Sequence, residues 1–184
     1  MGEEKILFVD IEASDLFASA GSIICIGIFD PENFKEPYIY FVRHPEDEEK
    51  VLEWLKEKLS ENNYLALSGW NIKNYDIPFI LGRSVKLNFD FSDLAKLKVI
   101  DLLEVARAAV KIHSYTMEDV CKWLDVDYSP ELKGQEIDSY YHKSLSGDRT
   151  AEEKIKNRCR EDLIALAELF EKLKPYLNLS RIRL

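Results

Sequence analysis

Two acidic residues interrupt an apolar run near the start of the sequence. Asp10 and Glu12 lie in the stretch FVDIEASDL, which continues an apolar run that begins at Ile6. Because side chains alternate along a strand, both carboxylates are expected on one face, roughly 7 Å apart. Like charges there repel unless one is protonated or a cation compensates them, and a divalent cation with oxygen ligands is the simplest compensation. The alternative is that the strand ends near Val9 and both acids are solvated loop residues.

A third acid lies on the last predicted helix. The apolar stripe of this helix recurs at steps of three and four residues and consists of Ile155, Cys159, Leu163, Leu166, Phe170 and Leu173. Asp162 falls at the border of that stripe, where lone acids are rarely placed. It therefore either serves a functional site or forms an i,i+4 ion pair with Arg158.

Two further aspartates have structural roles available to them. Asp76 follows GWNIKNY and precedes Ile-Pro-Phe-Ile, a position typical of a helix N-cap. Asp101 stands three residues before Glu104, which is the spacing of a capping box. From position alone, a helix cap is the favoured interpretation of both.

The elements that must position these acids indicate one α/β domain over residues 1–184. Strands are predicted over 5–11, 22–29, 37–43, 64–70 and 98–102, and helices over about 46–60, from Asp76, after 102, and over about 116–124 and 135–145. A capping box from Thr150 to Glu153 is expected to open a long final helix that ends near Tyr176. Short connections indicate that the first three strands are antiparallel neighbours. The order predicts a mixed sheet of about five strands flanked by helices.

Composition restricts the class of function and the compartment. The net charge of −9 counts against a protein that coats nucleic acid non-specifically, although it allows an enzyme with a local basic groove. Three cysteines, far apart and in apolar segments, favour reduced core thiols over a disulfide framework or a zinc site. We find neither a signal peptide nor a run of membrane-spanning length. A cytoplasmic protein without a membrane partner is expected.

Taken together, the acids resemble the DEDD superfamily of 3′-5′ exonucleases, which have the ribonuclease-H-like three-layer fold. Asp10-Ile11-Glu12 matches the family's first motif, on the first strand. Gly69-Trp70-Asn71 followed by Asp76 matches the second motif, and Asp162 in RCREDLIALAEL matches the third, on the last helix. The resemblance covers residues from about 5 to 175.

The resemblance implies an enzyme that hydrolyses phosphodiester bonds at the 3′ end of single-stranded DNA or RNA with two divalent cations, Mg²⁺ or Mn²⁺. One ion would be held by Asp10, Glu12 and Asp162, the other mainly by Asp10, with Asp76 acting largely through coordinated water. The substrate-binding positions implied by the same matching are Ala13, Ser14, Leu16, Asn71 and Asn74. Leu16 or Phe17 would either pack on a terminal base or be tucked into the core.

One catalytic position departs from the family pattern. The family usually has a Tyr four residues before the last Asp, or a His five residues before it, and Arg158 and Asn157 stand there instead. Arginine stays protonated in proteins and is a poor base. Either the metal alone lowers the pKa of the attacking water, or Arg158 pairs with Asp162 and weakens metal binding, or another residue takes over. The candidates to take over are Tyr140, Tyr141 and His142.

These observations predict a 3′-5′ exonuclease, with the choice of DNA or RNA and any partner in replication or repair left open. A nuclease-like module that binds a nucleic-acid end or a partner protein without cleaving is the second possibility. An endonuclease of the same fold is the third. Arg158 favours the binding module, whereas the presence of all four motif acids counts against it. These acids are Asp10, Glu12, Asp76 and Asp162.

Overall fold

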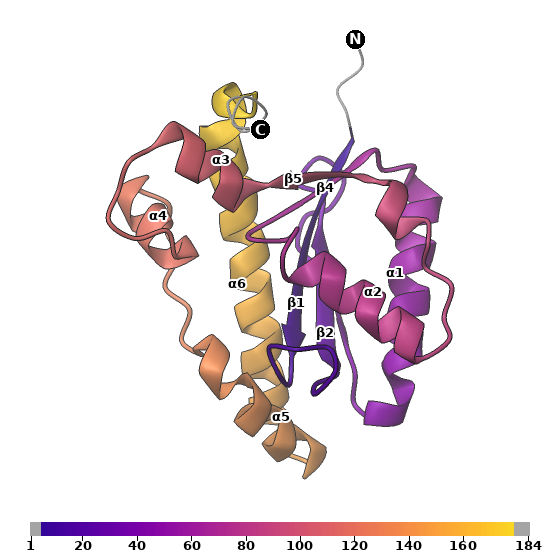
Figure 1. The fold of residues 1–184 in the computed structure, drawn as a ribbon. Coiled ribbons are helices and arrows are strands. Elements are labelled where there is room, and N and C mark those ends of the chain that lie inside the picture. The colour runs from indigo at the N-terminus through magenta and orange to yellow at the C-terminus, as the bar shows by residue number, and fades with distance from the viewer. Residues whose placement is uncertain (1–4, 179–184) are drawn as a thin grey trace.

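Five strands form one mixed sheet in this computed structural model, which describes residues 5–178 (Figure 1). The strands are β1 (Ile6–Ala13), β2 (Ile23–Phe29), β3 (Tyr38–Phe41), β4 (Ala66–Gly69) and β5 (Lys98–Asp101). Their order across the sheet is β3-β2-β1-β4-β5, which makes β1 central. Pairing is antiparallel from β1 to β2 and from β2 to β3, and parallel from β1 to β4 and from β4 to β5. The predicted mixed sheet of five strands is therefore confirmed.

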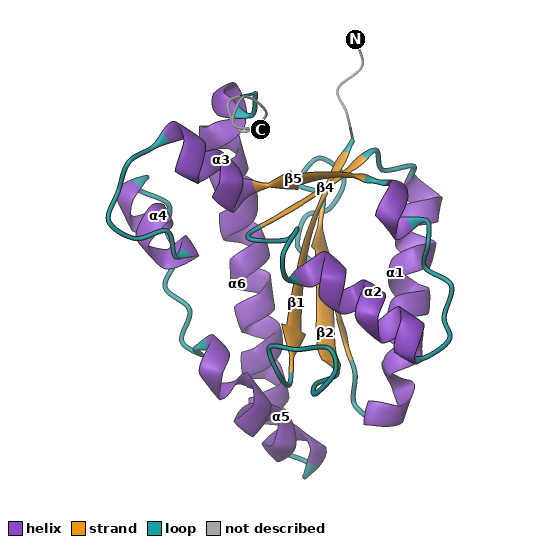
Figure 2. Ribbon diagram, viewed as in Figure 1, coloured by secondary structure: helices purple, strands orange, loops and turns teal. Residues whose placement is uncertain are grey.

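Helices cover both faces of the sheet, as Figure 2 shows. They are α1 (Glu48–Asn62), α2 (Asp76–Lys86), α3 (Leu102–Ala109), α4 (Met117–Trp123), α5 (Ile137–Leu145) and α6 (Arg149–Leu173). α1 and α2 pack on one face and form one apolar core with it, while α3 to α6 form a second core on the other face. The three cysteines are free and buried, as expected of core thiols. Within residues 5–178, no helix has the length and apolar character needed to cross a membrane.

The alternation of side chains along β1 sends its two acids toward α6. Leu7, Val9 and Ile11 belong to the core beneath α1 and α2. Phe8 belongs to the opposite core and packs edge-on against Phe170 of α6, with ring centroids 5.5 Å apart. Since Asp10 and Glu12 follow Phe8 at steps of two, they share its face. The strand thus continues through both acids, and the alternative of a solvated loop after Val9 is wrong.

Two predicted helix caps have different outcomes. Asp101 caps α3 as expected, because its carboxylate accepts a hydrogen bond from the Leu103 amide, but Glu104 pairs with Lys73 across the chain. The predicted cap of α6 at Thr150 is wrong. Asp148 caps this helix by accepting hydrogen bonds from the amides of Thr150 and Ala151 at 2.9 and 3.1 Å. Thr150 therefore already lies inside the first turn, where its own amide needs the acceptor that Asp148 supplies.

A glycine in β2 allows α6 to approach the sheet closely. Gly27 is the residue of β2 that pairs with Asp10. A β-carbon at this position would lie 2.6 Å from Leu163 Cδ1 and closer still to the sulfur of Cys159, both on α6. Only the missing side chain lets the helix lie against the strand here. The short distance between α6 and the sheet brings Asp162 to the acids of β1.

We predict that Gly27→Ala destabilises the fold by about 1–3 kcal/mol, the usual cost of inserting a methyl group into a packed interior. Urea denaturation measures this change in the free energy of unfolding. Gly134→Ala is a suitable control, because the nearest atom to its added β-carbon, Nη2 of Arg158, is 3.9 Å away. Equal destabilisation by the two substitutions would contradict the close packing inferred at Gly27.

Candidate active site

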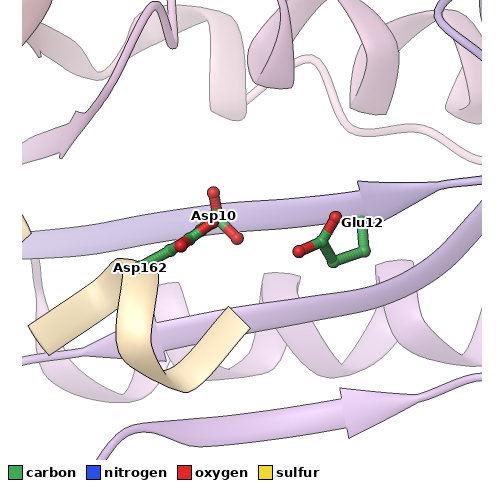
Figure 3. A group of neighbouring side chains, drawn as sticks. All are labelled: Asp10, Glu12 and Asp162. Atoms are coloured by element: carbon green, nitrogen blue, oxygen red, sulfur yellow. The ribbon is translucent and has the colours of Figure 1, made fainter. Parts of the chain in front are cut away.

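Three carboxylates from two distant parts of the chain converge above the centre of the sheet. Asp10 and Glu12 project from β1, and Asp162 reaches them from α6 (Figure 3). Each offers an oxygen, and these three oxygens lie within 4.8 Å of one another. The carboxylates are thus closer together than the roughly 7 Å that strand spacing alone gives for neighbours on one face.

The cluster contains a buried oxygen, Asp10 Oδ2, without a hydrogen-bond partner among the described residues. Glu12 and Asp162 are buried, with 7% and 4% of their surface exposed, and Asp10 is partly buried. Asp10 Oδ2 and Glu12 Oε1 are inaccessible to solvent and make no hydrogen bond within the described part of the chain, but Glu12 Oε1 is ion-paired with Arg158. Buried polar atoms are nearly always hydrogen-bonded in folded proteins, so Asp10 Oδ2 is the oxygen that indicates a ligand at this cluster.

Burial and mutual repulsion disfavour the charged form of all three acids. Burial, followed by the charges of Asp162 and Glu12, raises the pKa of Asp10 well above its ordinary value. Burial raises the pKa of Glu12 to about 8, although Arg158 opposes the shift. Burial also raises the pKa of Asp162, against the opposing influence of Arg158 and Tyr128. A cation in the cluster would reverse these shifts by stabilising the ionised forms.

Asp76 is buried near the cluster and accepts a hydrogen bond from the backbone of β1. It is the first residue of α2, but its side chain does not cap that helix. Its Oδ1 accepts a hydrogen bond of 3.2 Å from the amide of Ile11, the residue between Asp10 and Glu12. The pairing of β1 with β4 stops at Phe8, so Asp76 supplies the acceptor that the sheet no longer provides. Burial raises the pKa of Asp76 to about 7.

Asp101 and the segment that follows β4 form a second polar arrangement. The two carboxylate oxygens of Asp101 accept hydrogen bonds from the amides of Asn71 and Lys73, at 3.0 and 3.2 Å. Asn71 has a left-handed backbone, with φ of 57°, a conformation that asparagine tolerates better than most residues. Its side-chain oxygen accepts a hydrogen bond of 3.0 Å from Asn74. Asp101 therefore fixes the segment that carries both predicted substrate-binding asparagines.

The loop between β1 and β2, which follows Glu12 and Ala13 in the chain, exposes two large apolar side chains. Ala13 and Ser14 directly follow Glu12 and are partly exposed, and Ser14 Oγ accepts a hydrogen bond from the Ser22 amide. Leu16 and Phe17 have 75% and 69% of their surface exposed. Of the two alternatives left open for them, burial in the core is therefore wrong.

A buried ion pair anchors this loop to the helices below it. Arg83 of α2 and Glu48 of α1 are paired at 2.6 Å. Arg83 also donates a hydrogen bond of 3.0 Å to the carbonyl of Ala18, and Glu48 accepts one of 2.7 Å from the amide of Ile23. One charged pair thus holds the middle of the loop at Ala18 and its junction with β2 at Ile23, which restrains the segment that carries the exposed apolar residues.

Arg158 lies between two of the three carboxylates. Its Nε is 2.9 Å from Glu12 Oε1, and its Nη2 is 3.3 Å from Asp162 Oδ2. A third nitrogen, Nη1, donates a hydrogen bond of 2.8 Å to the carbonyl of Leu132. The pairing with Asp162 is one of the alternatives that the sequence left open, whereas the contact with Glu12 is new. Burial would lower the pKa of Arg158, but Asp162 and Glu12 raise it above its ordinary value, so this side chain cannot serve as a base.

Tyr128 contacts the cluster and was missed by the sequence analysis. It lies between α4 and α5, and its hydroxyl donates a hydrogen bond of 2.6 Å to Asp162 Oδ1. Burial and the charge of Asp162 raise its pKa above the ordinary value, so it acts as a hydrogen-bond donor. No periodicity links positions 128 and 162, so no local signal could have found this contact.

The three residues proposed to replace the missing family tyrosine make other contacts. Tyr141 is buried, and its hydroxyl donates to the carbonyl of Val42. The ring of Tyr140 lies under the ammonium group of Lys143, and His142 is exposed and faces Asp138. Tyr128 is therefore the tyrosine that reaches the carboxylates in the described part of the chain.

Comparison with known proteins identifies the family. Residues 7–174 match the sequence model of the RNase_H superfamily. The chain belongs to this superfamily. It is 22% identical over 171 residues to DNA polymerase 120R of Invertebrate iridescent virus 3, an alignment that covers 73% of this chain and 15% of the polymerase. The family B DNA polymerase of the archaeon Pyrobaculum calidifontis has a similar fold, with a TM-score of 0.78, 14% identity, and coverage of 92% of this chain and 24% of the polymerase.

Membership in the RNase_H superfamily agrees with the predicted fold and gives the carboxylates a chemical context. RNase H-like nucleases typically use divalent metal ions. The donors here are all carboxylate oxygens, the type that Mg²⁺ and Mn²⁺ prefer, and the buried Asp10 Oδ2 makes no hydrogen bond among residues 5–178. Asp10, Glu12 and Asp162 therefore fit a hard divalent cation.

In the absence of a cation, the free energy of unfolding is expected to fall as the pH rises from about 5 to about 8. The Glu12 carboxyl has a pKa of about 8 in the folded protein and an ordinary value of 4.5. The folded state therefore binds this proton more tightly than the unfolded chain and loses stability when the proton leaves. Asp76, with a pKa of about 7, acts in the same direction.

Urea denaturation in EDTA at about pH 5 and about pH 8 measures this fall in the free energy of unfolding. Glu12→Gln has no proton to lose at this position and should show a smaller decline than the natural protein. Added Mn²⁺ at the higher pH should stabilise the natural protein more than the variant. An equal decline in both proteins would contradict the assignment to Glu12.

Proposed function

We propose that this chain is a metal-dependent 3′-5′ exonuclease that hydrolyses phosphodiester bonds at the 3′ end of single-stranded DNA or RNA. The observation that carries the proposal is the convergence of Asp10, Glu12 and Asp162 on a fold of the RNase_H superfamily, with the buried Asp10 Oδ2 making no hydrogen bond in the described part of the chain. A nucleic-acid substrate agrees with this superfamily and with the similarity to polymerases. The direction of cleavage follows the resemblance of the acid motifs to DEDD exonucleases.

Asp10, Glu12 and Asp162 would hold divalent cations, Mg²⁺ or Mn²⁺, two of them when substrate is bound, with Asp76 contributing largely through water. Bound cations would supply a nucleophilic water and stabilise the leaving 3′ oxygen. Tyr128 would keep Asp162 in one orientation through its hydrogen bond of 2.6 Å. We assign Arg158 a role in charge compensation at the catalytic centre.

The substrate would run across the loop between β1 and β2. The exposed Leu16 and Phe17 would contact the faces of unstacked bases, which favours a single strand over a duplex. Ala13 and Ser14 would line the pocket for the terminal nucleotide, and Asn71 and Asn74 would contact the strand. Contacts with the nucleic-acid strand must be confined to the site, because a protein with a net charge of −9 has no general attraction for nucleic acid.

The similarity to two DNA polymerases favours DNA over RNA and a place in DNA replication or repair. The chain corresponds to only 15% of the viral polymerase and 24% of the archaeal one. We therefore carry no polymerase activity over to it.

A second candidate function is a module that binds nucleic-acid ends without cleaving them. The observation that favours it is the contact of Arg158 with both Glu12 and Asp162, which places a positive charge where a metal ion would bind. The two functions differ in one outcome, which is cleavage.

Single-stranded DNA and RNA labelled at the 5′ end, incubated with Mg²⁺, Mn²⁺ or EDTA, test the proposal. We expect a ladder of products that shortens from the 3′ end, depends on the metal and disappears in EDTA. Asp10→Asn should lower the rate by on the order of 10²-fold or more, because a metal ion supplies several kcal/mol of transition-state stabilisation. Asp93→Asn is the matched control, since Asp93 is exposed and pairs with Lys96.

Two other results would contradict the exonuclease. Internal fragments in place of a ladder would indicate an endonuclease of the same fold. Retained binding without cleavage, with either metal, would indicate the binding module.

Tyr128→Phe is expected to lower kcat by roughly 10-fold with little change in KM, because a hydrogen bond to a charged group contributes about 1.5–3 kcal/mol. Tyr141→Phe removes a hydroxyl that also makes a hydrogen bond, to the carbonyl of Val42, away from the acids. Both variants should lose thermal stability, but only Tyr128→Phe should lose turnover. Equal kcat values in the two variants would show that the Tyr128 hydroxyl is only structural.

A further inference from the structure

The carboxylate cluster already contains one positive charge that belongs to the protein. The guanidinium of Arg158 contacts Glu12 at 2.9 Å and Asp162 at 3.3 Å, while Asp10 Oδ2 remains without a hydrogen-bond partner among residues 5–178. This charge affects how many cations the cluster can bind, an inference that rests on the function proposed above.

The arginine is built into the site by a contact outside the acids. Its Nη1 donates to the carbonyl of Leu132, and only 17% of its side chain is exposed. Its neighbour Cys159 is fully buried against the sheet, which fixes this turn of α6. Arg158 therefore differs from a mobile surface arginine, which would pair with acids only transiently.

Charge balance limits what else the cluster can take up. Asp10, Glu12 and Asp162 carry three negative charges when ionised, and Asp76, whose charge acts on Asp10 and Glu12, adds a fourth. One guanidinium and one divalent cation leave a single negative charge among these groups. A second divalent cation would turn the net charge of a largely buried site positive, which is unfavourable without a further anion. Without the guanidinium, two divalent cations would balance the four carboxylates.

Arg158 contacts Glu12 and Asp162 and leaves Asp10 Oδ2 without a hydrogen-bond partner in the described part of the chain. Arg158 Nε and Glu12 Oε1 are close, yet neither makes a hydrogen bond of good geometry. The contact is therefore an ion pair without a well-aligned hydrogen bond. Asp10 Oδ2 is thus the buried oxygen of the cluster that Arg158 does not contact, and it makes no hydrogen bond among residues 5–178. Asp162 is held on its two oxygens by Tyr128 and Arg158.

We propose that in the substrate-free protein the Arg158 guanidinium takes the place of one of two cations, so that the free protein binds a single divalent ion. We call Arg158 the resident cation of the site, because its positive charge is always present there. Removal of this charge makes the position available to a second divalent ion.

The number of Mn²⁺ ions bound per chain, counted from the electron paramagnetic resonance signal of free Mn²⁺, tests this without any substrate. We expect one ion in the natural protein, one in Arg158→Lys, which keeps the charge, and two in Arg158→Gln. Arg160→Gln is the matched control, because it removes the same charge from the same helix and Arg160 donates to Asn157. This control should bind one ion.

Each other outcome has a definite meaning. Two ions in the natural protein would overturn the role of Arg158 and leave the proposed function intact. One ion in Arg158→Gln would also overturn it. No ion in any protein would contradict both the resident cation and the metal-dependent nuclease.

Loss of Arg158 leaves buried acids uncompensated, so Arg158→Gln is expected to be less stable without metal. Arg158→Met, whose apolar side chain retains more of the packing, provides a second neutral variant for the ion count. For either neutral variant, Mn²⁺ should raise the melting temperature more than it does for the natural protein. An equal rise in the natural protein and the neutral variants would contradict the proposal.

Discussion

Repulsion among three carboxylates is the interaction on which the rest of this structure depends. Asp10, Glu12 and Asp162 offer oxygens within 4.8 Å of one another in a largely buried place, where like charges are costly. The fold brings them together by pressing α6 onto the sheet at Gly27, opposite Asp10. Arg158 compensates part of the charge, and a divalent cation would compensate what remains. A buried site in which carboxylates repel one another is suited to bind cations. A role in stabilising the fold would not explain it.

The parts of the site that follow a regular period could be predicted from the sequence. Strand alternation placed Asp10 and Glu12 on one face, and the apolar stripe of the last helix placed Asp162 at its border. Both patterns depend on burial over many residues, so they survive the details of tertiary packing. The helix cap at Thr150 was wrong because Asp148, two residues earlier, offers an equally good acceptor. Sequence alone does not rank such competing local signals.

The contacts made by irregular segments could not be predicted. Tyr128 reaches Asp162 from a connection between two helices, and Arg158 finds the carbonyl of Leu132 in the same connection. Asp76 looked like a helix cap, yet its carboxylate bonds the amide of Ile11 where the neighbouring strand has ended. Each of these contacts depends on where a loop crosses the site, which no spacing in the sequence encodes. They are also the contacts that set the charge and orientation of the acids.

Anomalous diffraction from a crystal of the substrate-free protein grown with Mn²⁺ tests the central claim most directly. The account predicts an anomalous peak in contact with carboxylate oxygens of Asp10 and Glu12, with Arg158 still beside Asp162. No peak at these acids, at a concentration of Mn²⁺ that supports cleavage, would contradict the account. The carboxylates would then have to be compensated by protonation and by Arg158 alone.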